Sequence, residues 1–78
     1  MPNFSERLKA LRKERRLYQR ELAELLAISV RGYQCYETGE HEPGVKKLIA
    51  LADYYNVSID YLVGRTDAPD FRAVRTEE

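Results

Sequence analysis

The fold is decided by the stretch QRELAELLAISVRGYQCYE, residues 19–37. Its first part places three apolar side chains at helical spacing: Leu22, Ala23 and Leu26. Glu21 falls in the first turn of that pattern, where a negative charge interacts favourably with the helix dipole. We therefore predict a short helix that begins at Gln19.

A second short helix is predicted directly after the first. The apolar spacing breaks before Ser29, a residue type that caps helix N-termini. Residues Val30–Glu37 then carry two tyrosines, and Gly39 can end the helix. The stretch is therefore interpreted as two short helices joined by a turn of about three residues.

Further helices are predicted on both sides of this pair. Apolar spacing and capping residues predict one helix over residues 4–15, another over 45–56 and a last short one within 58–64. No segment reads convincingly as a strand. The sequence therefore predicts an all-α domain of five helices over residues 1–64, followed by a flexible C-terminal tail, residues 65–78.

Size and composition limit what the chain can do. Its 78 residues make one domain at most, and 44% hydrophobic with 33% charged residues is typical of a soluble globular protein. No apolar run is as long as a membrane span and no signal peptide follows Met1, so we expect a cytoplasmic protein without membrane contact. Cys35 is the only cysteine and His41 the only histidine, so we expect no internal disulfide, no bound metal and no cofactor.

The net charge is zero, which by itself argues against strong non-specific binding to nucleic acid. The charges are unevenly distributed, however. Residues 1–39 hold eight Lys/Arg and five Asp/Glu, whereas residues 40–78 hold five and eight, which gives net charges of +3 and −3. A basic face can therefore exist without a basic average.

An ordered set of residues extends over most of the chain, from about Phe4 to Gly64: Arg7-Leu8-Lys9 with Leu11-Arg12, Gln19 with Glu21-Leu22-Ala23, Ile28-Ser29, Tyr36-Glu37 with Gly39, Pro43, Leu48, Leu51-Ala52, Val57-Ser58 and Leu62. This set resembles the Cro/CI-type helix-turn-helix family, also called the XRE family. The resemblance implies a five-helix bundle of the lambda-repressor-like DNA-binding type. In that arrangement the first short helix crosses the DNA backbone and the second enters the major groove.

The resemblance also implies roles in DNA binding. Four residues match the family positions that face the major groove: Val30, Arg31, Gln34 and Cys35. Arg31 suits guanine, Gln34 adenine and Val30 a thymine methyl, and the alternative for this face is an ordinary solvated helix surface. Gln19 matches a residue that bonds a DNA phosphate, helps to orient the second short helix and can reach a groove-facing side chain. Arg20 is a further candidate phosphate contact.

Arg12 and Glu37 match a family pair that forms a partly buried salt bridge. A planar guanidinium that holds a carboxylate would fix the second short helix relative to the first helix of the bundle. We therefore expect the pair to matter for folding first.

The sequence departs from the family pattern at several positions. Tyr18 stands where the family prefers Ser or Thr as a helix N-cap, so one backbone N–H loses its usual acceptor, and the tyrosine hydroxyl becomes a candidate phosphate contact. Gly32 lies inside the second short helix at a cost of about 1 kcal/mol relative to alanine, and either allows close approach to a phosphate or is simply tolerated. Glu40 and Glu42 flank His41 in the following loop and would repel a nearby phosphate.

The predicted function is sequence-specific binding of double-stranded DNA as a transcriptional regulator, with repression expected, by a homodimer on a pseudo-palindromic operator. Tyr54, Tyr61 and Val63 form the candidate dimer interface, and the alternative is that they complete the core. A second hypothesis is a protein-interaction module, such as an antitoxin-like or anti-repressor partner, that retains the fold. An enzyme is not expected, because the sequence has no glycine-rich phosphate loop and no nucleophile paired with a histidine at a recognisable site.

Overall fold

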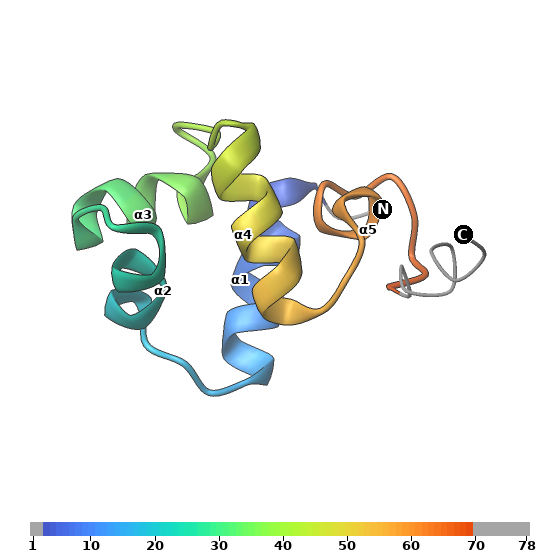
Figure 1. Ribbon diagram of the computed structural model, residues 1–78, viewed down its shortest axis with the longest axis horizontal. Coiled ribbons are helices and arrows are strands. Elements are labelled where there is room, and N and C mark those ends of the chain that lie inside the picture. The colour runs from blue at the N-terminus through green and yellow to red at the C-terminus, as the bar shows by residue number, and fades with distance from the viewer. Residues whose placement is uncertain (1–2, 70–78) are drawn as a thin grey trace.

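The computed structural model describes residues 3–69 of the chain and contains five helices over that range. They are α1 (Phe4–Glu14), α2 (Gln19–Leu26), α3 (Val30–Thr38), α4 (Val45–Tyr55) and α5 (Ile59–Leu62). Figure 1 shows α2 and α3 at one end of the molecule and α5 at the other, with α1 and α4 crossing between them. The predicted all-α class is confirmed, and no strand occurs within residues 3–69.

Capping side chains explain where three of the five helices begin. Asn3 and Glu6 form a reciprocal capping box at the start of α1, with backbone N–H to side-chain distances of 2.9 and 3.1 Å. The hydroxyl of Ser29 accepts from the N–H of Gly32 at 3.0 Å, and the hydroxyl of Ser58 accepts from the N–H of Tyr61 at 2.9 Å. These bonds satisfy N–H groups that have no partner inside their own helix. The starts of α1, α3 and α5 therefore follow from local residue choices, whereas Tyr18 before α2 and Gly44 before α4 make no side-chain cap hydrogen bond.

The core draws buried apolar side chains from every helix. They are Leu8 and Leu11 of α1, Leu22, Ala23 and Leu26 of α2, Tyr33 of α3, Leu51, Ala52 and Tyr55 of α4, Val57 and Leu62. Only one of these eleven side chains belongs to α3. Tyr36 of α3 is half-buried and also packs against this core. Apolar burial thus holds α3 through one fully buried and one half-buried side chain, and its orientation also depends on polar contacts.

Residues 65–69 return along the domain. Arg7, only 5% exposed, donates to the Thr66 carbonyl at 3.4 Å and to the Asp67 carboxylate at 3.1 Å, and its guanidinium lies 3.9 Å from the centre of the Tyr61 ring. The N–H of Ser58 also donates to the carbonyl of Pro69 at 3.1 Å. Within the first part of the predicted tail, Thr66 and Asp67 thus contact α1, and Pro69 contacts the residue that caps α5.

The remainder of the predicted tail, residues 70–78, lies outside the described residues. That the domain ends at residue 64 and the tail begins at residue 65 stays a prediction. Among the helices that the structure describes, none has the length and apolar character needed to cross a membrane.

Candidate nucleic-acid interface

The outward side of α3 carries the residues predicted to read DNA bases. Gln34 and Cys35 follow Arg31 by three and four residues, so both lie next to it on one side of the helix. Val30 begins the helix and is 41% exposed. Tyr33, by contrast, is fully buried against the core. The structure therefore places the four predicted base contacts on the outward side of α3, with Val30 and Arg31 exposed and Gln34 and Cys35 half-buried.

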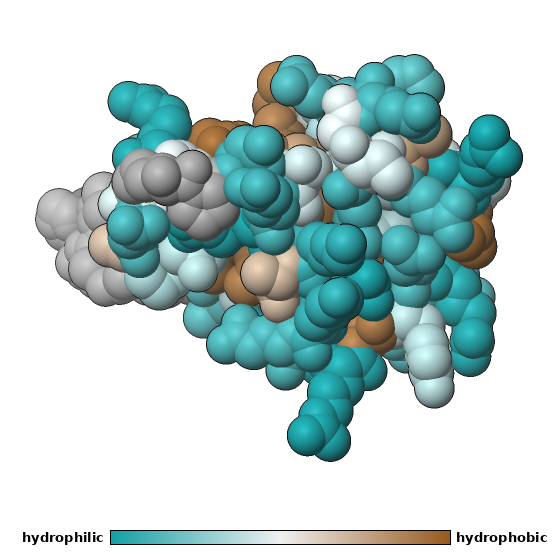
Figure 2. Space-filling view, turned by 180° about the vertical axis from the view of Figure 1, so that it is seen from behind, coloured by the Kyte–Doolittle hydropathy of each residue, from teal (hydrophilic) through white to brown (hydrophobic). Residues whose placement is uncertain are grey.

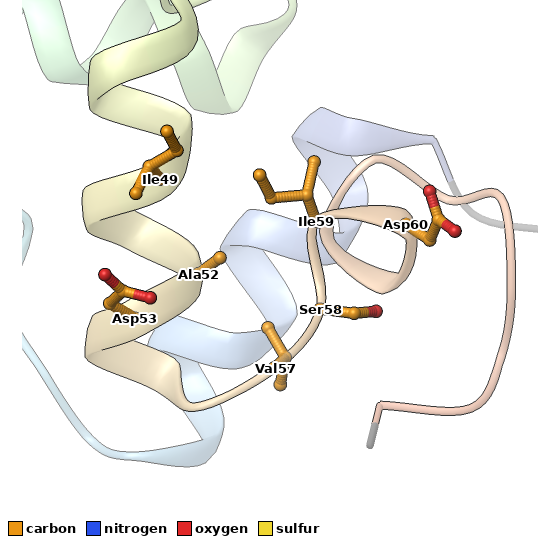
Figure 3. Close-up of a pocket in the computed structure, with 7 residues that line it drawn as sticks. All are labelled: Ile49, Ala52, Asp53, Val57, Ser58, Ile59 and Asp60. Carbon is orange, nitrogen blue, oxygen red and sulfur yellow. The ribbon is translucent and has the colours of Figure 1, made fainter. Parts of the chain in front are cut away.

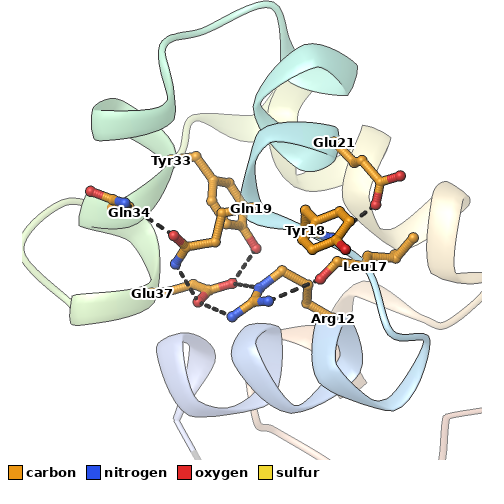
Figure 4. Close-up of polar contacts among 8 residues, drawn as sticks. All are labelled: Arg12, Leu17, Tyr18, Gln19, Glu21, Tyr33, Gln34 and Glu37. Atoms are coloured by element: carbon orange, nitrogen blue, oxygen red, sulfur yellow. Dashed lines mark hydrogen bonds and ion pairs between the residues drawn. The ribbon is translucent and has the colours of Figure 1, made fainter.

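A chain of side-chain amides connects α2 to this surface. The Nε2 of Gln19 donates to the Oε1 of Glu37 at 3.1 Å, and the Nε2 of Gln34 donates to the Oε1 of Gln19 at 3.0 Å (Figure 4). Because a carboxylate only accepts, the amide of Gln19 must turn its nitrogen to Glu37 and its oxygen to Gln34. Gln34 then retains its own oxygen and one N–H, the pair that would bond the N6 and N7 atoms of adenine.

Glu37 is in turn held by Arg12 of α1. The Nε of Arg12 lies 2.6 Å from Oε2 of Glu37 and its Nη2 lies 3.0 Å from Oε1, which makes a two-point ion pair. The third nitrogen of Arg12 donates to the carbonyl of Leu17 at 3.0 Å. The two charged side chains are only 13% and 4% exposed. The pair predicted from the resemblance is thus present, and it ties α3 to α1.

Tyr33 supplies a fourth donor to the same carboxylate, through a hydroxyl 2.5 Å from Oε2 of Glu37. Burial by itself would raise the pKa of Glu37, but hydrogen bonds from Arg12, Tyr33 and Gln19 outweigh it and leave that pKa below its usual value. Burial, reinforced by the bond to Glu37, raises the pKa of Tyr33 far above its ordinary value. Glu37 is therefore charged and Tyr33 neutral at pH 7.

Sequence reasoning did not assign Tyr33 and Leu17 to this network. The spacing of four between Tyr33 and Glu37 could have indicated that contact, since such residues meet on a helix. The carbonyl of Leu17 carries no sequence signal, because any residue type offers the same acceptor.

The predicted phosphate contacts lie around the N-termini of α2 and α3. Tyr18 is 62% exposed, and the guanidinium of Arg20 lies 4.8 Å from the centre of its ring. The carboxylate of Glu21 accepts from the backbone N–H of Tyr18 at 2.8 Å. Gly32 uses its N–H to bond Ser29, and a Cβ added there would lie 3.2 Å from that hydroxyl. The absence of a side chain at Gly32 thus gives room to the cap of α3.

The three candidate dimer residues have different neighbours. Tyr54 is 42% exposed and makes an edge contact with Tyr55, with ring centres 5.2 Å apart. Tyr61 is half-buried under Arg7. Val63 lies in a hollow together with Phe4, Pro43 and Leu48.

A separate groove lies between α4 and the start of α5 (Figure 3). Ile49, Val57 and Ile59 form much of its apolar wall, and Asp53 of α4 and Asp60 of α5 lie on opposite sides of it. On the opposite face of the molecule the surface is mostly hydrophilic, with apolar areas that are small and separate (Figure 2). The groove offers an apolar wall with charged edges and does not bring two acidic groups together.

Comparison with known proteins agrees with this geometry. The sequence model of the family described as "Helix-turn-helix" matches residues 8–62. The "Uncharacterized HTH-type transcriptional regulator YobD" of Bacillus subtilis is 40% identical over 72 residues, which cover 92% of this chain and 64% of that protein. The chain spans about half to two thirds of the length of the curated relatives it matches.

Two solved structures are also similar. The crystal structure of a transcriptional regulator from Listeria innocua has a TM-score of 0.77 and 46% identity, and covers 78% of this chain and 57% of that one. The P22 c2 repressor protein, crystallised with synthetic operator 9T in the presence of Tl+, has a TM-score of 0.74 and 30% identity. That match covers 81% of this chain and 96% of the repressor chain. With the family match over residues 8–62, these likenesses show that the chain belongs to the Cro/CI-type helix-turn-helix family.

Proposed function

We propose that this chain binds double-stranded DNA sequence-specifically and acts as a transcriptional regulator, with repression as the expected effect. The single observation that carries the proposal is the exposed side of α3, on which the amide of Gln34 is oriented through Gln19 and Glu37. An amide that is already oriented loses less side-chain freedom when it pairs with adenine, so this arrangement favours base reading. The likeness to a repressor solved with its operator supports the same function.

The base contacts that we propose are Val30, Arg31, Gln34 and Cys35, with phosphate contacts from Gln19, Tyr18, Arg20 and the backbone around Gly32. Residues 1–39 carry a net charge of +3, which attracts DNA phosphates although the net charge of the whole chain is zero. We place this function in the cytoplasm and assign no enzymatic step to it.

We also propose that the protein acts as a homodimer on two half-sites about one helical turn apart. A single small domain makes few contacts, so two linked copies bind DNA far more tightly than one. Tyr54, Tyr61 and Val63 are the proposed contact residues. Tyr61 and Val63 belong to the α5 end, which Figure 1 places away from α3, so such a contact would leave α3 uncovered.

The second candidate function is a protein-interaction module, such as an antitoxin-like or anti-repressor partner. Exposed Glu40 and Glu42 after α3 favour it, because acidic groups weaken binding to phosphate. The apolar groove between α4 and α5 offers a surface for a protein partner.

Selection of random duplex DNA by the purified protein, at two salt concentrations, separates the two functions. A DNA-binding regulator enriches a motif, palindromic if it is a dimer, and loses affinity steeply as salt rises. Failure of the folded protein to enrich any motif at low salt would refute the proposed function and favour the protein-interaction module.

A further inference from the structure

The reading side of α3 extends beyond the four proposed base contacts. Arg31, Cys35 and Thr38 follow one another at spacings of four and three, so they lie in one row along the helix. The helix ends at Gly39, whose φ of 88° is the left-handed conformation that reverses the chain direction. The loop that follows therefore begins at the end of this row.

Two hydrogen bonds hold the loop against the end of α3, and a third, within the helix, positions the Thr38 hydroxyl that one of them uses. The N–H of His41 donates to the carbonyl of Cys35 at 3.2 Å, and the hydroxyl of Thr38 donates to the same carbonyl at 3.2 Å. The N–H of Glu40 donates to that hydroxyl at 3.4 Å. The backbone of Glu40 is thus fixed relative to Cys35.

The side chain of Glu40 turns toward the reading side. The thiol of Cys35 donates to its Oε1 at 3.3 Å. This hydrogen bond raises the pKa of the Cys35 thiol, while nearby Arg31 acts in the opposite direction. Arg31, Cys35 and Glu40 therefore gather at one place, next to two of the proposed base contacts.

On the basis of the proposed function, we propose that Glu40 is a further specificity-determining residue, whose carboxylate reads the base pair that lies next to Cys35. A carboxylate accepts a hydrogen bond from the N4 amino group of cytosine. It repels guanine at the same place, because O6 and N7 of guanine are both acceptors. Glu40 thus selects cytosine and rejects guanine at one position of the operator.

Glu42 provides a matched control within the chain. It lies only two residues further on, but it lines hollows with Asn3, Phe4 and Leu48, and Cys35 lines neither of them. The substitutions Glu40→Gln and Glu42→Gln change the net charge equally. Only the first alters the reading side of α3.

The test is the same selection from random duplexes, carried out with the wild type, Glu40→Gln and Glu42→Gln. The wild-type motif should contain a cytosine-preferring position. Glu40→Gln should relax that preference by roughly fivefold or more, since a glutamine can also donate to guanine, while the rest of the motif stays the same. Glu42→Gln should keep the wild-type motif, and both variants should melt near the wild-type temperature.

Three results would overturn the inference: a wild-type motif that lacks such a position, an unchanged preference in Glu40→Gln, or equal changes in the two variants. A wild type that enriches no motif would remove the proposed function, and this inference with it. If the wild type enriches a motif and Glu40→Gln enriches the same one, the inference about Glu40 is wrong but the proposed function stands.

Discussion

Replacement of Arg12 by alanine should destabilise the fold strongly. The substitution removes both bonds of the ion pair to Glu37, at 2.6 and 3.0 Å, and the bond to the Leu17 carbonyl at 3.0 Å. It leaves a carboxylate that is only 4% exposed with two neutral donors, Tyr33 and Gln19. Removal of one partner of a buried pair costs about 3–5 kcal/mol.

That cost is large for a chain of this size. A domain of 78 residues is expected to have a free energy of unfolding of about 4–12 kcal/mol. In small domains each kcal/mol shifts the melting temperature by about 4–8 °C, so Arg12→Ala should lower it by at least about 12 °C. Thermal unfolding followed by circular dichroism at pH 7 measures the shift.

Arg65→Ala is the control for loss of an arginine from an ion pair. Arg65 and Asp60 are 3.4 Å apart, but their side chains are 74% and 60% exposed, so their pairing contributes about 0–1 kcal/mol. We expect a melting temperature close to that of the wild type. If Arg12→Ala shifted the melting temperature no more than Arg65→Ala does, the argument from burial would be refuted.

The effect of Arg12→Ala should also depend on pH. The pKa of Glu37 is lower in the folded state than in the unfolded state. Ionisation of Glu37 therefore stabilises the fold at pH values above the unfolded-state pKa. This stabilisation is lost as the pH falls through the folded-state pKa. Without Arg12 the main hydrogen-bonded cause of the lowered pKa is gone. The difference in stability between wild type and variant should therefore be largest near pH 7 and shrink in acid; a constant difference would contradict this reasoning.

Three further substitutions test separate parts of the structure. Tyr55→Phe removes a buried hydroxyl that has no hydrogen-bond partner within residues 3–69. The free energy of unfolding, measured by urea titration, should therefore stay the same or rise by up to about 1 kcal/mol. A clear loss of stability would show that the hydroxyl has a partner. Arg31→Ala should relax one base preference at an unchanged melting temperature, and an unaltered motif would exclude Arg31 from base reading. Gln19→Ala removes the hydrogen bond that orients the amide of Gln34. In competition binding, the preference for adenine over other bases should therefore weaken by about 1–3 kcal/mol. An unchanged preference would show that Gln34 needs no such orientation.

The helix order could be predicted from the sequence because its signals are local. Ser29 and Ser58 cap the helices that follow them, as predicted. The ends differ by one residue: α1 stops at Glu14 instead of Arg15, and α3 continues to Thr38. Helix ends are less well determined, because a last turn has several ways to satisfy its carbonyls.

Contacts between distant parts of the chain could not be predicted without a resemblance. Arg7 is bonded to Thr66 and Asp67 and stacks on Tyr61, more than fifty residues away, and nothing near it in sequence indicates burial. A lysine or arginine on a helix is ordinarily a solvated residue. The bond between Cys35 and Glu40 was also not predicted, because it depends on a loop that bonds back onto its own helix.

The polar network around Glu37 determines the rotation of α3 about its own axis, which apolar contacts alone determine weakly. Buried Tyr33 and half-buried Tyr36 hold the helix to the core, but apolar contacts alone determine its rotation weakly, since hydrophobic contacts have no direction. Hydrogen bonds have direction, and Glu37 receives them from Arg12 of α1, Gln19 of α2 and Tyr33 of its own helix. These bonds fix how α3 is turned, and hence which side chains face outward. If α3 reads bases as proposed, we therefore expect substitutions at Val30 or Arg31 to alter base preference alone, and substitutions at Gln19 or Glu37 to alter stability and base preference together.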